Sequence, residues 1–157
     1  MATEKWIAGT VGLTWANAFS TGTLNSIAAG NAILSDLQLD NSSNLDMFCD
    51  VEVVLAALTT GAPNYIGVYL YPLNSDGSTY GDGRFTSSAA GPPPSQYAVG
   101  TIGVPIVTTT AVQGTLRGIL MPPGKFKFVL YHQAHASNAF ASSGNTCKYR
   151  TYNPSVA

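Results

Sequence analysis

Hydrophobic and polar residues alternate with a period of two along most of this chain, as they do in strands with one buried and one wet face. The alternating runs are rich in β-branched and aromatic residues, and turn-forming segments such as "DNSSN", "NSDG" and "MPPG" separate them. The pattern predicts strands at 33–39, 45–58, 65–71, 97–106, 112–121, 126–133 and 145–152, with a further strand at 12–19. We therefore expect an all-β fold, most naturally a β-sandwich of the eight-stranded jelly-roll type.

The domain organisation is predicted to be simple. No composition break or internal repeat divides the 157 residues, so 1–157 is expected to be a single β-sandwich domain, in which 1–11 could be an extended N-terminal arm. No run reaches the ~18 apolar residues that a membrane-spanning helix needs. The start of the chain also lacks the pattern of a secretory signal, so we expect synthesis in the cytoplasm and no membrane partner.

The alternation also predicts which side chains lie inside. Within 65–71, Ile66, Val68 and Leu70 are expected to face the core. For the segments 126–133 and 45–58 we expect an inner set of Phe126, Phe128, Leu130 and His132, and of Met47, Cys49, Val51, Val53 and Leu55. The corresponding outer sets are Lys125, Lys127, Val129, Tyr131 and Gln133, a face that its lysines mark as wet at least at its start, and Asp46, Asp50 and Glu52.

The two cysteines are predicted to be structural. Cys49 and Cys147 lie far apart in the sequence and match no zinc or redox spacing. Each falls on the inner face of its strand, where a free thiol behaves as a small hydrophobic group. We expect two reduced, buried thiols rather than a disulfide.

Composition narrows the classes of partner. The hydrophobic fraction of 45% is enough for a core, whereas the charged fraction of 10% is far below the roughly 25% of ordinary soluble domains. With a net charge of −1 and no basic stripe, nucleic acid is a poor candidate partner. A weakly charged surface suits a protein that packs against other proteins.

The only histidines, His132 and His135, form an H-x-x-H spacing that can serve metal or acid–base chemistry on a helix. On a strand, however, residues three apart point to opposite faces. We therefore place His132 at the margin of the core and His135 in a loop, and we assign neither a site.

Other candidate chemistry is equally weak. Asp50 and Glu52 share one flat strand face, which does not flank a scissile bond as glycosidase carboxylates do. Asn74, Asp76 and Asp82 lie in a glycine-rich loop that lacks the acidic spacing of an EF-hand, so turn chemistry is favoured over calcium binding. No nucleophile, phosphate-binding or zinc motif is present. The sequence predicts a protein that is not an enzyme, with no catalytic, cofactor-binding or metal residue.

Two features do indicate a protein partner. In "YIGVYLY" the residues Tyr65, Tyr69 and Tyr71 alternate with the aliphatic set, so they form an outward aromatic row. This row is either an interface or is covered by a loop of the same chain. The second feature is the stiff segment "AAGPPPSQY", and its interface candidates are Phe85, Pro92, Pro93, Pro94 and Tyr97. That segment could instead simply bridge the two sheets.

Four strings, "YGDGRF", "AAGPPPSQY", "PPGKFKFVLY" and "SGNTCKYRTYN", together resemble a family of small virion structural proteins of tailed bacteriophages. The likeness runs roughly from Leu24 to Tyr152, in the same order and at similar spacing. It departs from the family pattern around 132–140, where a more neutral hairpin is expected, and at Cys147, where an aliphatic residue is expected. None of the strings is a catalytic signature.

The resemblance implies a component of the virus particle, synthesised in the host cytoplasm and assembled into the virion. The expected function is a capsid cement or decoration protein of jelly-roll type. Its expected partners are the major capsid protein and further copies of itself in a symmetric homo-oligomer. The alternative is a carbohydrate-binding or host-attachment module on the tail, because the resemblance does not distinguish head, neck and tail.

Overall fold

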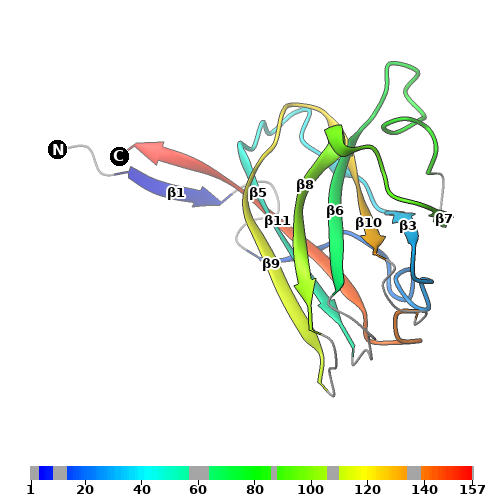
Figure 1. Ribbon diagram of the computed structural model, residues 1–157. Coiled ribbons are helices and arrows are strands. Elements are labelled where there is room, and N and C mark those ends of the chain that lie inside the picture. The colour runs from blue at the N-terminus through cyan, green and yellow to red at the C-terminus, as the bar shows by residue number, and fades with distance from the viewer. Residues whose placement is uncertain are drawn as a thin grey trace.

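The computed structural model describes residues 4–8, 14–56, 64–85, 88–105, 110–133 and 139–156, and these residues form two antiparallel sheets packed face to face (Figure 1). This confirms the predicted all-β sandwich. The helical element in this part of the chain is a single 3-10 turn, η1 (Ser95–Tyr97). Within the same residues, no helix has the length and apolar character needed to cross a membrane.

The two sheets join strands that are far apart in the sequence. The first, sheet A, has the order β1 (Glu4–Ala8), β11 (Thr146–Val156), β5 (Phe48–Leu55) and β9 (Val112–Leu120), with β2 (Ala16–Asn17) also on β11. The second, sheet C, has the order β7 (Ser88–Ala90), β3 (Asn31–Leu34), β10 (Lys125–His132), β6 (Asn64–Pro72) and β8 (Ala98–Val104), with β4 (Leu39–Asp40) also on β10.

The observed strands differ from the predicted ones at four places. The predicted strand 33–39 is interrupted between β3 and β4, where the Ser35 hydroxyl donates to the Leu37 carbonyl and accepts from the Phe128 N–H. Of the predicted strand 12–19, the described part contributes only the two residues of β2. The strands β1 and β7 were not predicted, and β1 lies in the segment that was considered as an N-terminal arm.

The main core lies between the sheets and follows the predicted alternation. The buried inner residues include the predicted sets Cys49, Val51, Val53 and Leu55 on β5, Ile66, Val68 and Leu70 on β6, and Phe126, Phe128 and Leu130 on β10. Met47 is the exception, because β5 begins one residue later and the side chain is 47% exposed. Asp46 and Asp50 were predicted to be wet and are buried instead, each within a set of hydrogen bonds described below.

The cysteines are free and buried, as predicted. Cys49 pairs in register with Thr151, four residues beyond Cys147 on β11. At about 3.4 Å per residue, this offset separates the two backbone positions by roughly 14 Å along the strands, beyond the Cα–Cα distance of a disulfide.

A second, smaller core lies on the outer face of sheet C. Its members are Ala32, Leu34, Tyr71, Phe85 and Val129. The connection from β6 to β8 folds over this face and contributes Phe85. Gly81 makes the close fit possible: its backbone has φ +57°, and a Cβ there would lie 2.2 Å from the Tyr71 ring. The outer face of sheet C is therefore partly covered by the chain itself.

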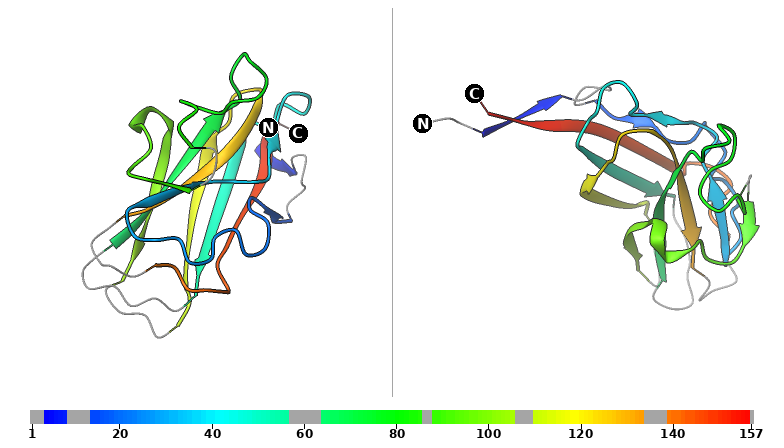
Figure 2. Two further views of the ribbon diagram at one scale, coloured as in Figure 1. Left: turned by 90° about the vertical axis from the view of Figure 1, so that its right-hand side faces the viewer. Right: turned by 90° about the horizontal axis from the view of Figure 1, so that it is seen from above.

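The strands β1 and β11 leave the body of the sandwich together. They pair from Glu4 with Val156 to Ala8 with Tyr152, and this two-stranded ribbon projects away from both sheets (Figures 1 and 2). The last residue of β11 that pairs with β5 is Tyr152, opposite Phe48. In the part of the chain that the structure describes, Asn153–Val156 pair only with β1.

Candidate interaction surfaces

The predicted tyrosine row is divided between a buried and an exposed part. Tyr71 is fully buried, and its ring packs against Phe85 at 6.2 Å and Tyr97 at 4.6 Å between centroids. Tyr71 and Phe85 are therefore interior residues, one beneath a loop of the same chain and the other part of that loop, not surface residues as an interface would require. Tyr97 is half-buried at the edge of this cluster.

The exposed part of the row gains a third tyrosine from the neighbouring strand. Tyr65 is 36% exposed and Tyr69 is half-buried, with its ring over Gly67, where a Cβ would come within 2.8 Å of that ring. Gly67 pairs in register with Tyr131 on β10. Burial, and then the nearby phenols of Tyr65 and Tyr131, raise the pKa of Tyr69. We call Tyr65, Tyr69 and Tyr131 the tyrosine face.

The proline-rich segment is held against the body by one arginine. Arg84 donates from its two terminal nitrogens to the carbonyls of Pro92 (3.2 Å) and Ala90 (2.7 Å), and its guanidinium lies 5.0 Å from the centre of the Phe85 ring. Among the interface candidates here, Pro92 is exposed, Pro94 is half-buried and Pro93 is buried. The segment therefore presents Pro92 and Pro94 on a fixed backbone.

The outer face of sheet A carries an ion pair between the buried Asp50 and the partly exposed Arg150 instead of a second apolar core. Arg150 donates from Nε and a terminal nitrogen to one Asp50 oxygen, at 3.0 and 2.9 Å. The other Asp50 oxygen accepts from the Gly118 N–H and the Tyr152 hydroxyl, at 3.0 and 2.9 Å. The Arg150 guanidinium also lies 4.9 Å from the centre of the Trp15 ring. We call these residues the Asp50 lock.

Burial alone would raise the pKa of Asp50, but these donors outweigh it and lower the pKa from its ordinary value of 3.8. The lock forms where β5 and β9 fall out of register, between Cys49 and Val51. It fixes β11 at Arg150 and Tyr152, immediately before the ribbon leaves the sheet.

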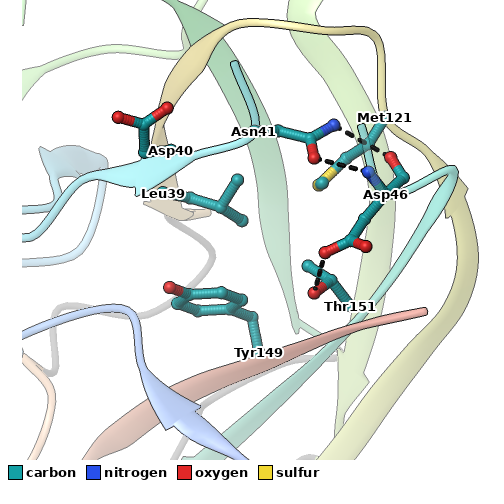
Figure 3. Close-up of a pocket in the computed structure, with 7 residues that line it drawn as sticks. All are labelled: Leu39, Asp40, Asn41, Asp46, Met121, Tyr149 and Thr151. Carbon is teal, nitrogen blue, oxygen red and sulfur yellow. Dashed lines mark hydrogen bonds between the residues drawn. The ribbon is translucent and has the colours of Figure 1, made fainter. Parts of the chain in front are cut away.

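A second buried carboxylate braces the loop that leads into β5. Asn41 accepts from the Asp46 N–H at 2.7 Å and donates to the Asp46 carbonyl at 2.9 Å, while the Asp46 carboxylate accepts from Thr151 at 2.6 Å (Figure 3). Asn153 also donates to Asp46, at 3.0 Å. The adjoining cavity holds about 20 Å³, the size of one water molecule, which is too small for an organic ligand.

Large apolar side chains gather at the same end of the molecule. Leu120, Phe48 and Tyr152 pair in register across β9, β5 and β11 on the outer face of sheet A, and the rings of Phe48 and Tyr152 stack at 5.8 Å. Leu120 is 66% exposed, and Leu45 and Met47 beside β5 are 56% and 47% exposed. We call Leu45, Met47, Phe48, Leu120 and Tyr152 the rim patch.

The histidine and loop candidates have structural roles where the structure describes them. His132 is buried, its Nδ1 lies 3.3 Å from the Ile27 carbonyl, and its ring stacks on Phe140 at 4.3 Å. His135 lies outside the described residues. In the glycine-rich loop, one Asp76 oxygen accepts from the backbone N–H groups of Ser78 and Thr79, at 2.8 and 2.9 Å, which is turn chemistry.

Sequence reasoning found only part of these surfaces. Tyr131 follows from the same alternation that identified the tyrosine row, because its outer position on β10 was predicted. The rim patch carries no comparable signal, since Phe48, Leu120 and Tyr152 come from three separate segments that only the strand register brings together. Neither the comparison with protein-family models nor the comparison with curated proteins finds a match to this chain.

Proposed function

We propose that this protein is a non-enzymatic structural protein of a tailed-phage virion, a cement protein that binds the outer capsid lattice and braces contacts between capsomers. The observation that carries the proposal is the tyrosine face: three uncharged aromatic side chains on two paired strands, presented on a rigid sheet. Tyrosine gives large contact area at low cost in side-chain entropy, which suits a permanent protein–protein contact.

The fold supports the same interpretation. With β3 and β4 counted as one interrupted strand, the layers have the orders β2-β11-β5-β9 and β3/β4-β10-β6-β8, which fits the jelly-roll type. The Arg84-braced proline segment adds a stiff edge beside the sheet that carries the tyrosines. On a capsid, symmetry repeats each modest contact many times, and repetition converts weak binding into avidity.

The proposal is tested with particles that carry a Tyr65→Ala variant. Loss of an aromatic anchor from a buried interface costs about 2 kcal/mol or more, roughly a thirtyfold weaker contact. We expect lower occupancy per particle by quantitative gel densitometry, and earlier DNA release on heating when the protein is absent. Leu37→Ala is the control, because Leu37 is 40% exposed but lies between β3 and β4, away from the tyrosine face.

The alternative function, a carbohydrate-binding or attachment module on the tail, draws on the same tyrosine face, since exposed rings on a flat sheet can stack on sugars. Copy number separates the two functions. A few copies per particle, with unchanged heat stability in particles lacking the protein, would reject the cement function. Binding to host glycans that Tyr65→Ala abolishes would then establish the alternative.

A further inference from the structure

A cavity of about 170 Å³ opens at the end of the sandwich that lies away from the ribbon. It lies between the chain around β2 and the turn that leads into β11, whose other end forms the ribbon (Figure 1). At about 30 Å³ for each water molecule, the cavity has room for several. Unlike the 20 Å³ cavity beside Asp46, it can therefore hold a small organic molecule.

The lining of this cavity is polar but uncharged. Among the described residues that line it, every polar side chain is an amide or a hydroxyl, and none is ionisable. Phe19 and Leu24, which are buried in the main core, contribute the apolar part of the lining. A charged group that entered the cavity would find no counter-charge in its walls, and burying an unpaired charge is costly. The lining therefore favours a neutral ligand.

The cavity wall is fixed by a buried asparagine. Asn145 is 6% exposed, and its Nδ2 donates to the Asn25 Oδ1 at 3.0 Å and to the Ala141 carbonyl at 2.7 Å. Its Oδ1 accepts from the Ala56 N–H at 3.1 Å. These three bonds hold Asn145 in one orientation, and the first of them also orients the Asn25 amide. Because the Asn25 oxygen is occupied, its amide nitrogen is the group left to donate.

Several polar groups around the cavity are not used by the fold. The Asn25 amide nitrogen and the hydroxyls of Thr21, Ser143 and Thr146 have no hydrogen-bond partner within the described residues. Gly22 leaves the Asn25 nitrogen uncovered on one side, because a Cβ at Gly22 would lie 3.6 Å from it. Each hydroxyl can both donate and accept, so these groups together match a ligand that carries several hydroxyls.

We propose that this cavity binds one ring of a neutral sugar through its amide and hydroxyl groups. A sugar ring is uncharged, is small enough for the cavity, and presents hydroxyls that donate and accept. An apolar group from a partner protein would leave the polar groups unpaired, and a charged one would have no counter-charge. The inference goes beyond the capsid contact, and it uses a site separate from the tyrosine face on which the alternative tail function depends.

The first test is an NMR titration of isotope-labelled full-length protein with glucose, galactose, mannose and N-acetylglucosamine. We expect at least one sugar to shift the backbone amide signals of Gly22, Gly144 and Thr146, with a Kd in the millimolar range. Shifts at Gly67 and Thr101, which pair beside the tyrosine face, would place the sugar there and overturn the assignment. The absence of shifts with all of these sugars at about 100 mM would overturn it as well.

A second probe tests whether the hydroxyls carry the binding. Cyclohexylmethanol has a six-membered ring but a single hydroxyl, so it should bind at least about tenfold more weakly than the sugar that binds. Equal or tighter binding of cyclohexylmethanol would identify an apolar pocket, and the sugar assignment would then be wrong.

Substitutions at Thr146 test the location. Thr146→Trp places a large, strand-compatible side chain at an exposed position in the cavity lining, so it should abolish sugar binding. Thr146→Val removes only the hydroxyl and should weaken binding roughly three- to tenfold. Thr101→Trp and Thr101→Val are the matched controls, because Thr101 is also exposed on a strand but does not line the cavity. Equal binding by the Thr146 and Thr101 variants would reject the site, and Thr146→Val decides if Thr146→Trp does not fold.

Particle occupancy separates this site from the cement function. Particles that carry Thr146→Trp should keep full occupancy by gel densitometry, because the tyrosine face is unchanged, while the isolated variant no longer binds sugar. Reduced occupancy of Thr146→Trp, together with no sugar binding by the wild-type protein, would make this end of the sandwich a capsid contact and overturn the inference.

Discussion

The main core covers neither of the two outer sheet faces, and these two faces are stabilised in different ways. On sheet C the chain folds its own β6–β8 connection over part of the face, and Phe85 of this connection packs with the buried Tyr71 and Val129. On sheet A the covering is a network of charged hydrogen bonds around Asp50, and an apolar patch remains exposed beside it. The first face is stabilised by apolar packing and the second by fixed charge.

This difference bears on what each face can do. An apolar face that is buried by its own loop contributes stability and leaves only the remaining tyrosines for contact. The hydrogen bonds of the Asp50 lock orient β11 just where the ribbon departs, and Asn153, the next residue, is bonded to Met47 and Asp46 of the body. We therefore assign stability mainly to the covered part of sheet C and orientation of the ribbon to sheet A.

The largest effect is expected from Tyr71→Ala. Removing a fully buried aromatic ring that packs against Phe85 and Tyr97 should lower the free energy of unfolding by about 3–5 kcal/mol. Urea denaturation followed by circular dichroism measures it, and Tyr65→Ala on the same strand face should cost less than about 1 kcal/mol. Equal costs for Tyr71→Ala and Tyr65→Ala would show that the loop does not cover the sheet as described.

The next largest effect is expected from Asp50→Asn, which keeps the shape of the side chain but removes its charge. Hydrogen bonds to a charged group contribute about 1.5–3 kcal/mol, and Arg150 would keep a weaker partner, so we expect a loss of about 2–3 kcal/mol. Glu52→Gln is the control on the same strand face, since Glu52 is half-exposed and bonded to Gln113. A loss of less than about 0.5 kcal/mol in Asp50→Asn would mean that the lock does not stabilise the fold.

The strand pattern was predictable because the main core depends on local alternation. Residues such as Val51, Val53, Phe128 and Leu130 lie inside because every second residue of a strand faces one side. The same rule predicted the direction of Asp50 correctly and its environment wrongly. Asp50 does point away from the core, but Arg150, Gly118 and Tyr152 enclose it from distant parts of the chain.

The burial of Tyr71 within the tyrosine row shows the same limit of prediction from local alternation. Alternation placed Tyr65, Tyr69 and Tyr71 on one face, and it gave no information on which of them a loop would bury. That depends on where residues 73–85 and 88–97 fold back, for example on the close approach of Gly81, which has a positive φ, to the Tyr71 ring. The rim patch likewise depends on the pairing of β5 with β9 and β11. Local sequence periodicity therefore predicts the sandwich and its inner face, whereas the outer faces depend on long-range contacts.

The smallest effects are expected in the pH dependence of the free energy of unfolding. This dependence separates stabilisation by charged groups from stabilisation by apolar packing. Burial lowers the pKa of His132 from its ordinary 6.5, partly opposed by the hydrogen bond to Ile27. Between pH 6.5 and the lowered pKa, the unfolded chain therefore binds more protons at His132 than the folded chain does. The free energy of unfolding is thus at its full value above about pH 6.5 and falls as the pH decreases through this window. Asp50 has a lowered pKa, so its contribution is full above about 3.8 and is lost as the pH falls further.

Urea denaturation between pH 8 and pH 3, in a His135→Asn background that removes the other histidine, should show both losses. His132→Phe should remove the loss near neutral pH, and Asp50→Asn should reduce the acid loss while leaving the neutral one unchanged. Tyr71→Ala, although it costs the most, should shift the whole profile without changing its shape, because that cluster is held by apolar packing. A change of shape in Tyr71→Ala alone would contradict the division of the two faces into packed and charged.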